Sequence, residues 1–226
     1  MTRMTRTYRA VMAVATPIVR HWGRLEVVGL EHLPTDGPVL AVGNHDSYWD
    51  PVVVGVAARR QRQIQALAKS SMWKNPLLGK VLDGMGQIPI ERGKGDAHAM
   101  DTAIAELGGG TCIGIFPEGT ISRGQRLRAR SGAGRLALAV PGTTIVSVAV
   151  TGSVDIVRFP KRPRIRVEFF LPGGGQAQPG ESASAVTVRV VEEIRERAPI
   201  TIPGRRRTAA KYRARQLAVA EGATAE

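Results

Sequence analysis

The sequence predicts a single α/β domain with a mainly parallel, partly mixed sheet flanked by helices, plus an N-terminal amphipathic helical segment. Three observations predict this fold class. Short β-rich runs alternate with helix-like segments, and several runs are apolar without interruption, as in strands covered on both faces. The length of 226 residues suits one sizeable domain. We expect an amphipathic, membrane-interfacial helical segment at 1–24, the main domain at 25–203 and a basic C-terminal tail at 204–226.

The expected elements follow one another in order along the chain. Continuous apolar runs mark the strands, which we place at 25–29, 39–43, 64–68, 87–90, 111–116, 144–150 and 165–169. Between them lie helix-like segments, two of which begin with a proline that suits the first helical turn. We place these helices at 51–62, 76–85, 97–107 and 130–140, with a last helix at 185–197 after a triple-glycine loop.

The first segment is amphipathic when it is plotted at roughly 100° per residue. Arginines on one face and apolar side chains on the other suit a helix lying in the headgroup interface of a membrane. The pattern also suits a helix that packs its stripe on the protein's own core. Pro17 should break or kink this helix, so the segment forms either two shorter helical pieces or one long kinked helix. The apolar stripe consists of Met4, Tyr8, Val11, Met12, Ala15, Ile18, Val19 and Trp22.

The net charge of +13 is concentrated at the two ends of the chain, and the body between them is nearly neutral. The basic tail after Pro203 and Gly204 would suit an anionic membrane surface or a disordered end. A nucleic-acid arm is disfavoured because its basic residues lack interleaved aromatic residues apart from Tyr212. No apolar run approaches the roughly 18–20 residues that span a bilayer. We expect a peripheral protein on the cytoplasmic side of the cell membrane.

In α/β sheets ligands gather outside the carboxyl ends of the strands, and the polar segment 43–51 follows such a strand. Asp50 comes five residues after His45, at the entrance of the next helix. A carboxylate on one ring nitrogen fixes the imidazole tautomer and makes the other nitrogen a better base. The plainer interpretation is that Asp50 caps a helix and His45 satisfies a loop.

The segment 86–93 is a second polar site, where an apolar strand ends in Arg92. Its guanidinium suits bidentate capture of a phosphate. A surface salt bridge is the ordinary interpretation of one arginine alone.

The segment 113–124 is the third, and it runs from an apolar strand into a Pro-Glu-Gly turn. A carboxylate here would accept hydrogen bonds from substrate hydroxyls, and the backbone amides would face an anion. The polar side chains of this turn are Glu118, Thr120, Ser122 and Arg123.

Other chemistries find little support. The chain lacks a phosphate-binding glycine loop before a lysine, and it lacks clustered His and Cys ligands. We therefore expect no metal and no cofactor. The single cysteine, Cys112, excludes an internal disulfide, and its place in an expected buried strand predicts an apolar filler.

Three of these segments strongly resemble signature blocks of the glycerolipid acyltransferase family, whose best-known members are 1-acylglycerol-3-phosphate acyltransferases. The blocks read Asn-His-Asp-Ser-Tyr-Trp-Asp at 44–50 (a His-X4-Asp motif), Gly-Gln-Ile-Pro-Ile-Glu-Arg at 86–92 and Phe-Pro-Glu-Gly-Thr-Ile-Ser at 116–122. A fourth, looser block resembles 140–148, although the family usually has its proline inside the strand. The likeness runs in order from about residue 38 to 150.

By that resemblance, His45 is the base that takes the proton of the acceptor hydroxyl, and Asp50 is its partner. The resemblance also implies an acceptor site made by Glu118, Gly119 and Thr120, with Arg92 and Lys69 at the acceptor phosphate. Supporting residues would be Asn44, Ser47, Ser122 and Arg123.

The implied reaction transfers a fatty acyl group from acyl-CoA or acyl-carrier protein to a phosphorylated glycerolipid at an anionic membrane surface. Two alternatives stay open. The same chemistry on another lipid acceptor, such as a lysophospholipid or a glycolipid, would need the same base. A non-catalytic lipid- or nucleic-acid-binding protein would fit the charge, but it has no need of the His45–Asp50 spacing, and we expect no nucleic-acid partner.

Overall fold

A seven-stranded sheet forms the centre of the computed structural model, which describes residues 4–91, 96–160 and 162–200. The strand order is β1-β7-β6-β2-β5-β3-β4, and all neighbours are parallel except the antiparallel pair β6 and β7. The sheet is therefore mainly parallel and partly mixed, as predicted. The strands are β1 (Glu26–Val28), β2 (Val39–Gly43), β3 (Gln65–Lys69), β4 (Ile88–Ile90), β5 (Cys112–Ile115), β6 (Thr144–Thr151) and β7 (Arg166–Phe170).

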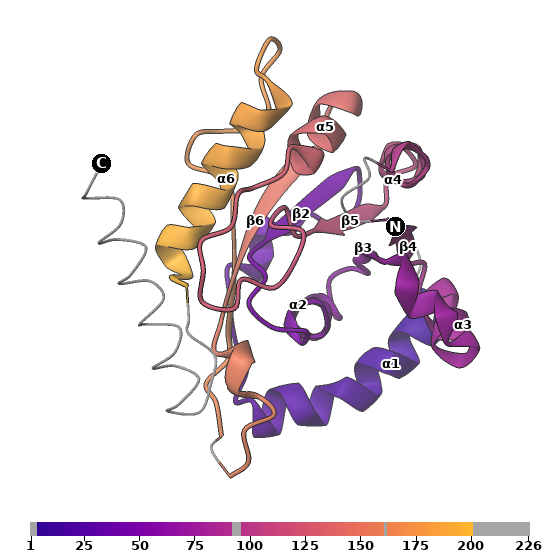
Figure 1. Cartoon of the computed structure of the whole chain (residues 1–226), viewed down its shortest axis with the longest axis vertical. Coiled ribbons are helices and arrows are strands. Elements are labelled where there is room, and N and C mark those ends of the chain that lie inside the picture. The colour runs from indigo at the N-terminus through magenta and orange to yellow at the C-terminus, as the bar shows by residue number, and fades with distance from the viewer. Residues whose placement is uncertain (1–3, 92–95, 161, 201–226) are drawn as a thin grey trace, which may run out of the picture.

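Helices cover both faces of this sheet (Figure 1). Along β2, Val39 and Ala41 join one apolar core with α1 and α2, whereas Leu40 and Val42 join a second core with α4, α5 and α6. The helices are α1 (Arg6–Thr16), α2 (Asp50–Ala58), α3 (Pro76–Gly84), α4 (Ala97–Gly108), α5 (Gly132–Ala139) and α6 (Ala183–Arg197). Shorter turns are η1 (Pro17–Trp22), η2 (Leu30–His32), η3 (Ser70–Lys74) and η4 (Ser153–Asp155).

Two predicted helices are shorter than the sequence pattern suggested. The helix predicted to end at residue 62 ends at Ala58, because Arg62 turns inward and donates to the carbonyls of the 34–37 loop and of Gly110. The helix predicted from residue 130 begins at Gly132. There Arg130 N–H donates to Pro117 O at 2.9 Å, which holds the preceding chain against the Pro-Glu-Gly turn.

The N-terminal stripe packs on the protein's own core, which is one of its two interpretations. Tyr8, Met12, Ala15 and Val19 are buried in the core that α1 shares with α2. Pro17 ends the α-helix, as predicted, and the chain continues as the π-helical turn η1. Contact of this segment with a membrane would therefore use its outer face, and it stays a prediction. The predicted basic tail lies beyond the described residues.

The parallel register brings the polar segments to one edge of the sheet. Strand β2 pairs with β5 on one side and with β6 on the other, and β5 pairs with β3. Their carboxyl ends therefore meet, and the chain leaves these strands at residues 44, 116, 152 and 70. This edge is where ligands bind in such folds.

Candidate active site

His45 and Asp50 form a buried pair at the end of the central strand β2. His45 Nδ1 lies 3.1 Å from Asp50 Oδ2, and the two residues are 5% and 0% exposed. The same carboxylate oxygen accepts the backbone N–H groups of Asp46 at 2.7 Å and Ser47 at 2.8 Å. The loop is thereby wrapped around the carboxylate that begins α2, so the five-residue spacing produces the contact that the sequence predicted.

The contacts of Asp50 determine the tautomer and the orientation of the His45 ring. Its second oxygen, Oδ1, accepts the hydroxyl of Ser153 at 2.5 Å. A carboxylate in this position favours the proton on Nδ1 of His45, which leaves the lone pair on Nε2. The imidazole also stacks on Phe116, with ring centroids 4.7 Å apart. Its ring is therefore oriented from two sides, as a general base requires.

Asn44 fixes the strand end from which His45 departs. Its side-chain amide donates to Val150 O at 2.9 Å and accepts Val150 N–H at 2.8 Å, which extends the pairing of β2 with β6 by one step. The same amide nitrogen donates to Asp46 at 2.9 Å. Ser47 contributes locally, because its hydroxyl accepts the N–H of Trp49 at 3.2 Å. Both residues support the loop through these bonds.

Glu118 is engaged by the protein on both oxygens. Oε2 accepts the backbone N–H of His45 at 2.9 Å, and Oε1 accepts Nε of Arg195 at 2.8 Å. The side chain of Glu118 is only 2% exposed. An acceptor hydroxyl would have to compete with these partners, so the geometry favours a role for Glu118 in holding the His45 turn.

Arg195 of α6 links the two site turns. Besides Glu118, it binds Asp46 with N–O distances of 2.8 and 3.1 Å, and its side chain is 9% exposed. Burial lowers its pKa, but hydrogen bonds from the guanidinium to Asp46 and Glu118 outweigh that effect, so the net pKa is raised. Arg195 is thus a fixed cation between two buried carboxylates.

The third block contributes one more buried support. Ser122 donates its backbone N–H to His45 O at 2.8 Å, and its hydroxyl donates to Asp46. By contrast, Thr120 and Arg123 are exposed, and Arg123 has a φ of +50°. The structure therefore joins Ser122 to the His45 turn and leaves the other two at the surface.

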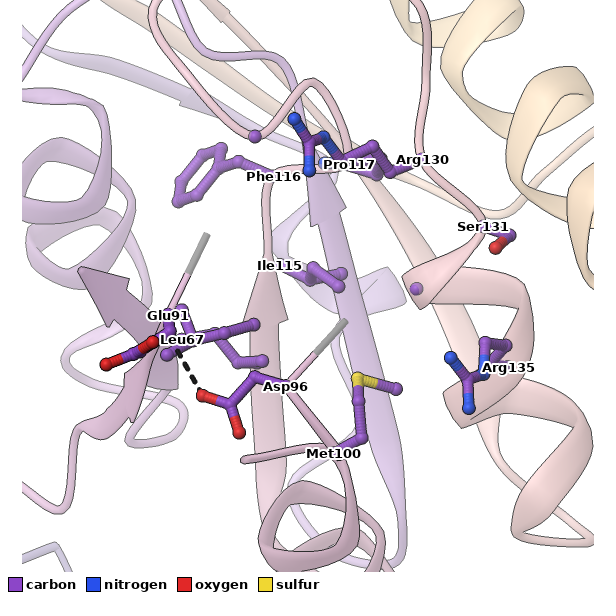
Figure 2. Close-up of a pocket in the computed structure, with 13 residues that line it drawn as sticks. Leu67, Glu91, Asp96, Met100, Ile115, Phe116, Pro117, Arg130, Ser131 and Arg135 are labelled. Atoms are coloured by element: carbon purple, nitrogen blue, oxygen red, sulfur yellow. Dashed lines mark hydrogen bonds between the residues drawn. The ribbon is translucent and has the colours of Figure 1, made fainter. Parts of the chain in front are cut away.

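A cavity of about 220 Å³ opens beside this turn (Figure 2). Phe116, which stacks on His45, also lines the cavity, together with apolar side chains such as Leu67 and Met100. Two arginines lie on its wall: Arg130 beside Phe116, and Arg135 on α5. Glu91 and Asp96 also line the cavity, so its wall carries charges of both signs on an apolar lining. Such a pocket can hold an amphiphile, and the two arginines are the groups that would contact an anionic part of it.

Gly119 and Lys69, two of the other predicted acceptor residues, lie at or near this cavity. Gly119 lines it with a φ of +70°, which favours glycine, and a Cβ there would lie 3.0 Å from Arg130 Nε, so the Arg130 side chain would have to shift for any other residue. Lys69 is exposed at the end of β3, opposite Ile90, which lines the cavity. Arg92 lies outside the described residues, and its predicted role at a phosphate stays a prediction.

Sequence reasoning missed several residues of the site. Asp46 was within the first block but had no role, and Ser153, Arg130 and Arg135 were not singled out. Arg195 gave one weak signal, because it follows buried Val191 by four residues and so lies at the edge of an apolar helical face. A charge in that position indicates a buried partner, but the partner could not be named from the sequence.

The chain is similar to known proteins over the segment that contains the three blocks. The family model named Acyltransferase matches residues 24–151, which include the three blocks. A lyso-ornithine lipid O-acyltransferase of Pseudomonas aeruginosa is 30% identical over 85% of this chain and 70% of that protein. A 1-acyl-sn-glycerol-3-phosphate acyltransferase of Borreliella burgdorferi is 35% identical over 56% of this chain, but only 51% of that protein is covered.

The fold has a counterpart among solved structures. The crystal structure of the 1-acyl-sn-glycerophosphate acyltransferase PlsC from Thermotoga maritima matches with a TM-score of 0.66 and 19% identity. The match covers 84% of this chain and 77% of that one. At this identity the likeness supports the α/β fold with its mixed sheet.

The chain belongs to the acyltransferase family, since the family model covers more than half of it. The protein is an O-acyltransferase of the glycerolipid type, which confirms the resemblance drawn from the three blocks. Its relatives include 1-acyl-sn-glycerol-3-phosphate acyltransferases of Borreliella burgdorferi and Bacillus subtilis. Within the described residues, no helix is long and apolar enough to cross a membrane.

Proposed function

We propose that this protein transfers a fatty acyl group from acyl-CoA or acyl-carrier protein to the free hydroxyl of 1-acylglycerol-3-phosphate, giving phosphatidic acid. The observation that carries the proposal is the buried His45–Asp50 pair, 3.1 Å apart, beside a cavity with two arginines on its wall. Two bacterial relatives, from Borreliella burgdorferi and Bacillus subtilis, are 1-acyl-sn-glycerol-3-phosphate acyltransferases.

In the proposed mechanism His45 acts as general base. Its Nε2 takes the proton of the acceptor hydroxyl while the hydroxyl oxygen attacks the thioester carbonyl carbon. The imidazolium that forms is stabilised by Asp50 through Nδ1–H. The tetrahedral intermediate then expels the thiolate, which takes the proton from Nε2, so the products are an ester and a thiol. The transfer is direct and needs no acyl-enzyme, metal or cofactor.

The acceptor would lie in the cavity beside Phe116. Arg130 and Arg135 line this cavity, and guanidinium groups bind phosphate with charge-assisted hydrogen bonds. Arg92 and Lys69 would add to that binding, as the resemblance implies. Gly119 and Thr120 belong to the turn at the mouth of the cavity, whereas Glu118 would act through the His45 backbone.

A second acceptor has a specific observation in its favour. A relative that matches 85% of this chain is a lyso-ornithine lipid O-acyltransferase, and the same base would serve an acceptor whose headgroup is ornithine. The two acceptors differ in their need for the cavity arginines, because 1-acylglycerol-3-phosphate carries a phosphate monoester and lyso-ornithine lipid does not. We favour the phosphate acceptor because of Arg130 and Arg135.

The test is acceptor-dependent thiol release from palmitoyl-CoA or palmitoyl-acyl-carrier protein, with the lipid product identified by mass spectrometry. Lysophosphatidic acid, lyso-ornithine lipid and a neutral monoacylglycerol are compared. We expect phosphatidic acid as the main product. Turnover of lyso-ornithine lipid alone would show that this lipid, and not lysophosphatidic acid, is the acceptor. No transfer to any acceptor would contradict the proposal.

The substrates place the protein at a membrane in this proposal. Lysophosphatidic acid and phosphatidic acid are amphiphiles of the bilayer, so we propose a peripheral protein on the cytoplasmic side of the cell membrane, facing an anionic lipid surface. Separation of membranes from cytosol, in the presence and absence of high salt, tests this placement, since a peripheral protein held by charge is released by salt.

A further inference from the structure

An exposed apolar tip lies at the sheet edge of the candidate site. The connection between β6 and β7 presents Val157 and Phe159, which are 71% and 84% exposed, and η1 adds Ile18, which is 42% exposed. We call these three residues, with Trp22 and Arg162, the docking face. In Figure 1 the β6–β7 connection (orange) lies beside the C-terminal end of α1. Large apolar side chains exposed together usually mark an interaction site.

The docking face is built by contacts between two segments that are far apart in the sequence. Phe159 stacks on Trp22, with centroids 5.8 Å apart and ring planes at 11°. Trp22 Nε1 donates to Ile156 O at 2.8 Å, and the Arg162 guanidinium donates to His21 O. Arg24 adds bonds to the carbonyls of Pro163 at 3.1 Å and Arg162 at 2.9 Å. The exposed Phe159 is therefore held in place by the fold.

Positive charge surrounds this apolar tip. Arg20, Arg24, Arg162 and Arg164 are all exposed, and Asp155 of the same connection is paired with Arg158 at 2.5 Å. Arginine around exposed aromatic and aliphatic side chains is the composition of surfaces that insert into a headgroup interface. Duplex nucleic acid would match the charge but offers no apolar surface to Val157 and Phe159. An acidic protein could bury them, and we favour the bilayer because the proposed acceptor is itself a bilayer lipid.

The docking face is also directly connected to the base. Strand β6 is parallel to β2, so the connection begins at the same edge of the sheet as the His45 loop. Ser153, in the first turn of the connection, donates to Asp50, and Val150 binds Asn44. A membrane bound at the docking face would therefore lie on the side of the sheet where the acceptor has to enter.

We propose that the docking face binds an anionic lipid bilayer, with Val157 and Phe159 entering the headgroup region and the arginines contacting anionic headgroups. This inference rests on the proposed function only in taking a membrane lipid as the acceptor. It assigns the contact to the β6–β7 connection and the outer side of η1. The buried stripe of α1 takes no part.

Vesicle co-sedimentation of the full chain tests the proposal. The probes are vesicles of phosphatidylcholine alone and of phosphatidylcholine with phosphatidylglycerol. The first variant carries Val157→Ser and Phe159→Ser, and the second carries only Val157→Ser, which leaves the Phe159–Trp22 stack intact. The matched control carries Leu138→Ser and Val188→Ser, two residues of α5 and α6 that are 36% and 38% exposed. Thermal melting checks that each variant is folded.

We expect wild-type protein and the control to bind anionic vesicles. The double variant should bind at least about tenfold more weakly, since it loses two apolar side chains that the bilayer would bury. The single variant should lie between them. Arg162→Gln should weaken binding to anionic vesicles and leave binding to neutral vesicles unchanged.

Equal binding by wild type and double variant would overturn the proposal, as would equal losses in the control. Binding to duplex DNA that is lost in the same variants, without vesicle binding, would also overturn it. Acyl transfer by wild-type protein that binds no vesicles would refute the docking face and leave the proposed function standing. Vesicle binding that is lost only in the docking-face variants would support the docking face even if no acyl transfer were detected.

Discussion

Arg195 of α6 donates from Nε to Glu118 Oε1 at 2.8 Å, and Glu118 Oε2 in turn accepts the backbone N–H of His45 at 2.9 Å. A helix near the end of the described chain therefore holds the turn that carries His45, the proposed base. Arg195 lies outside the segment that matches the family model, residues 24–151. The site is complete only when α6 packs on the sheet.

Arg195→Met should lower both stability and activity. The change leaves Asp46 and Glu118 as buried carboxylates without their cation, which typically costs about 3–5 kcal/mol. It also releases the His45 turn, so kcat should fall more than KM rises. Arg195→Lys keeps the charge but loses the paired geometry, and it should recover part of the activity. Urea unfolding and steady-state kinetics measure the two effects.

Arg189→Met is the matched control on the same helix. Arg189 pairs with Glu181 at 2.7 Å, and both side chains are partly exposed at 24% and 20%. Its loss should cost about 1 kcal/mol or less and leave kcat unchanged. Equal losses of kcat in the two methionine variants would show that Arg195 acts only by stabilising α6.

Arg130→Ala and Arg135→Ala should each raise KM for lysophosphatidic acid while changing kcat little. A hydrogen bond to a charged group contributes about 1.5–3 kcal/mol, which corresponds to a KM increase of about tenfold or more. Arg126→Ala is the control, because its side chain is 74% exposed and lies outside the cavity lining. If neither cavity variant affects KM for lysophosphatidic acid more than for a neutral acceptor, the phosphate does not bind here.

Cys112→Ala should retain acyl transfer. Burial raises the pKa of the Cys112 thiol to about 12, so the group stays a neutral thiol over the whole working range of pH. A neutral buried thiol is a poor nucleophile, and direct transfer does not need one. We expect no inactivation of the native wild-type protein by iodoacetamide. Loss of activity in Cys112→Ala, with an unchanged melting profile, would point to an acyl-enzyme.

The sheet could be predicted from the sequence because strands that are buried on both faces consist mainly of consecutive apolar residues. Val39 to Gly43 and Cys112 to Ile115 are examples, and each predicted strand has a counterpart in the structure. The His45–Asp50 contact was also predictable, since both residues belong to one loop and their spacing constrains it. Helix ends were less predictable, because Arg62 and Arg130 form hydrogen bonds with distant segments, and the local sequence pattern does not predict such bonds.

The parts of the site that the sequence did not predict depend on long-range packing. Arg195 is one of 32 basic residues, and only the packing of α6 selects it as the partner of Glu118. Ser153 reaches Asp50 across 103 positions of sequence for the same reason. The composition of the α1 stripe suits two environments and favours the membrane interface over the core. Its burial on α2 is decided by the rest of the fold.

The central claim, that His45 is the base of an acyl transfer, is tested most directly by thiol release from palmitoyl-CoA with lysophosphatidic acid, comparing wild type with His45→Ala and Asp50→Asn. Loss of a general base typically costs about 10²–10⁴ in rate. We predict acceptor-dependent release by the wild type, a loss of that size in folded His45→Ala, and a smaller one in Asp50→Asn. Acceptor-dependent release that persists undiminished in His45→Ala would contradict the account.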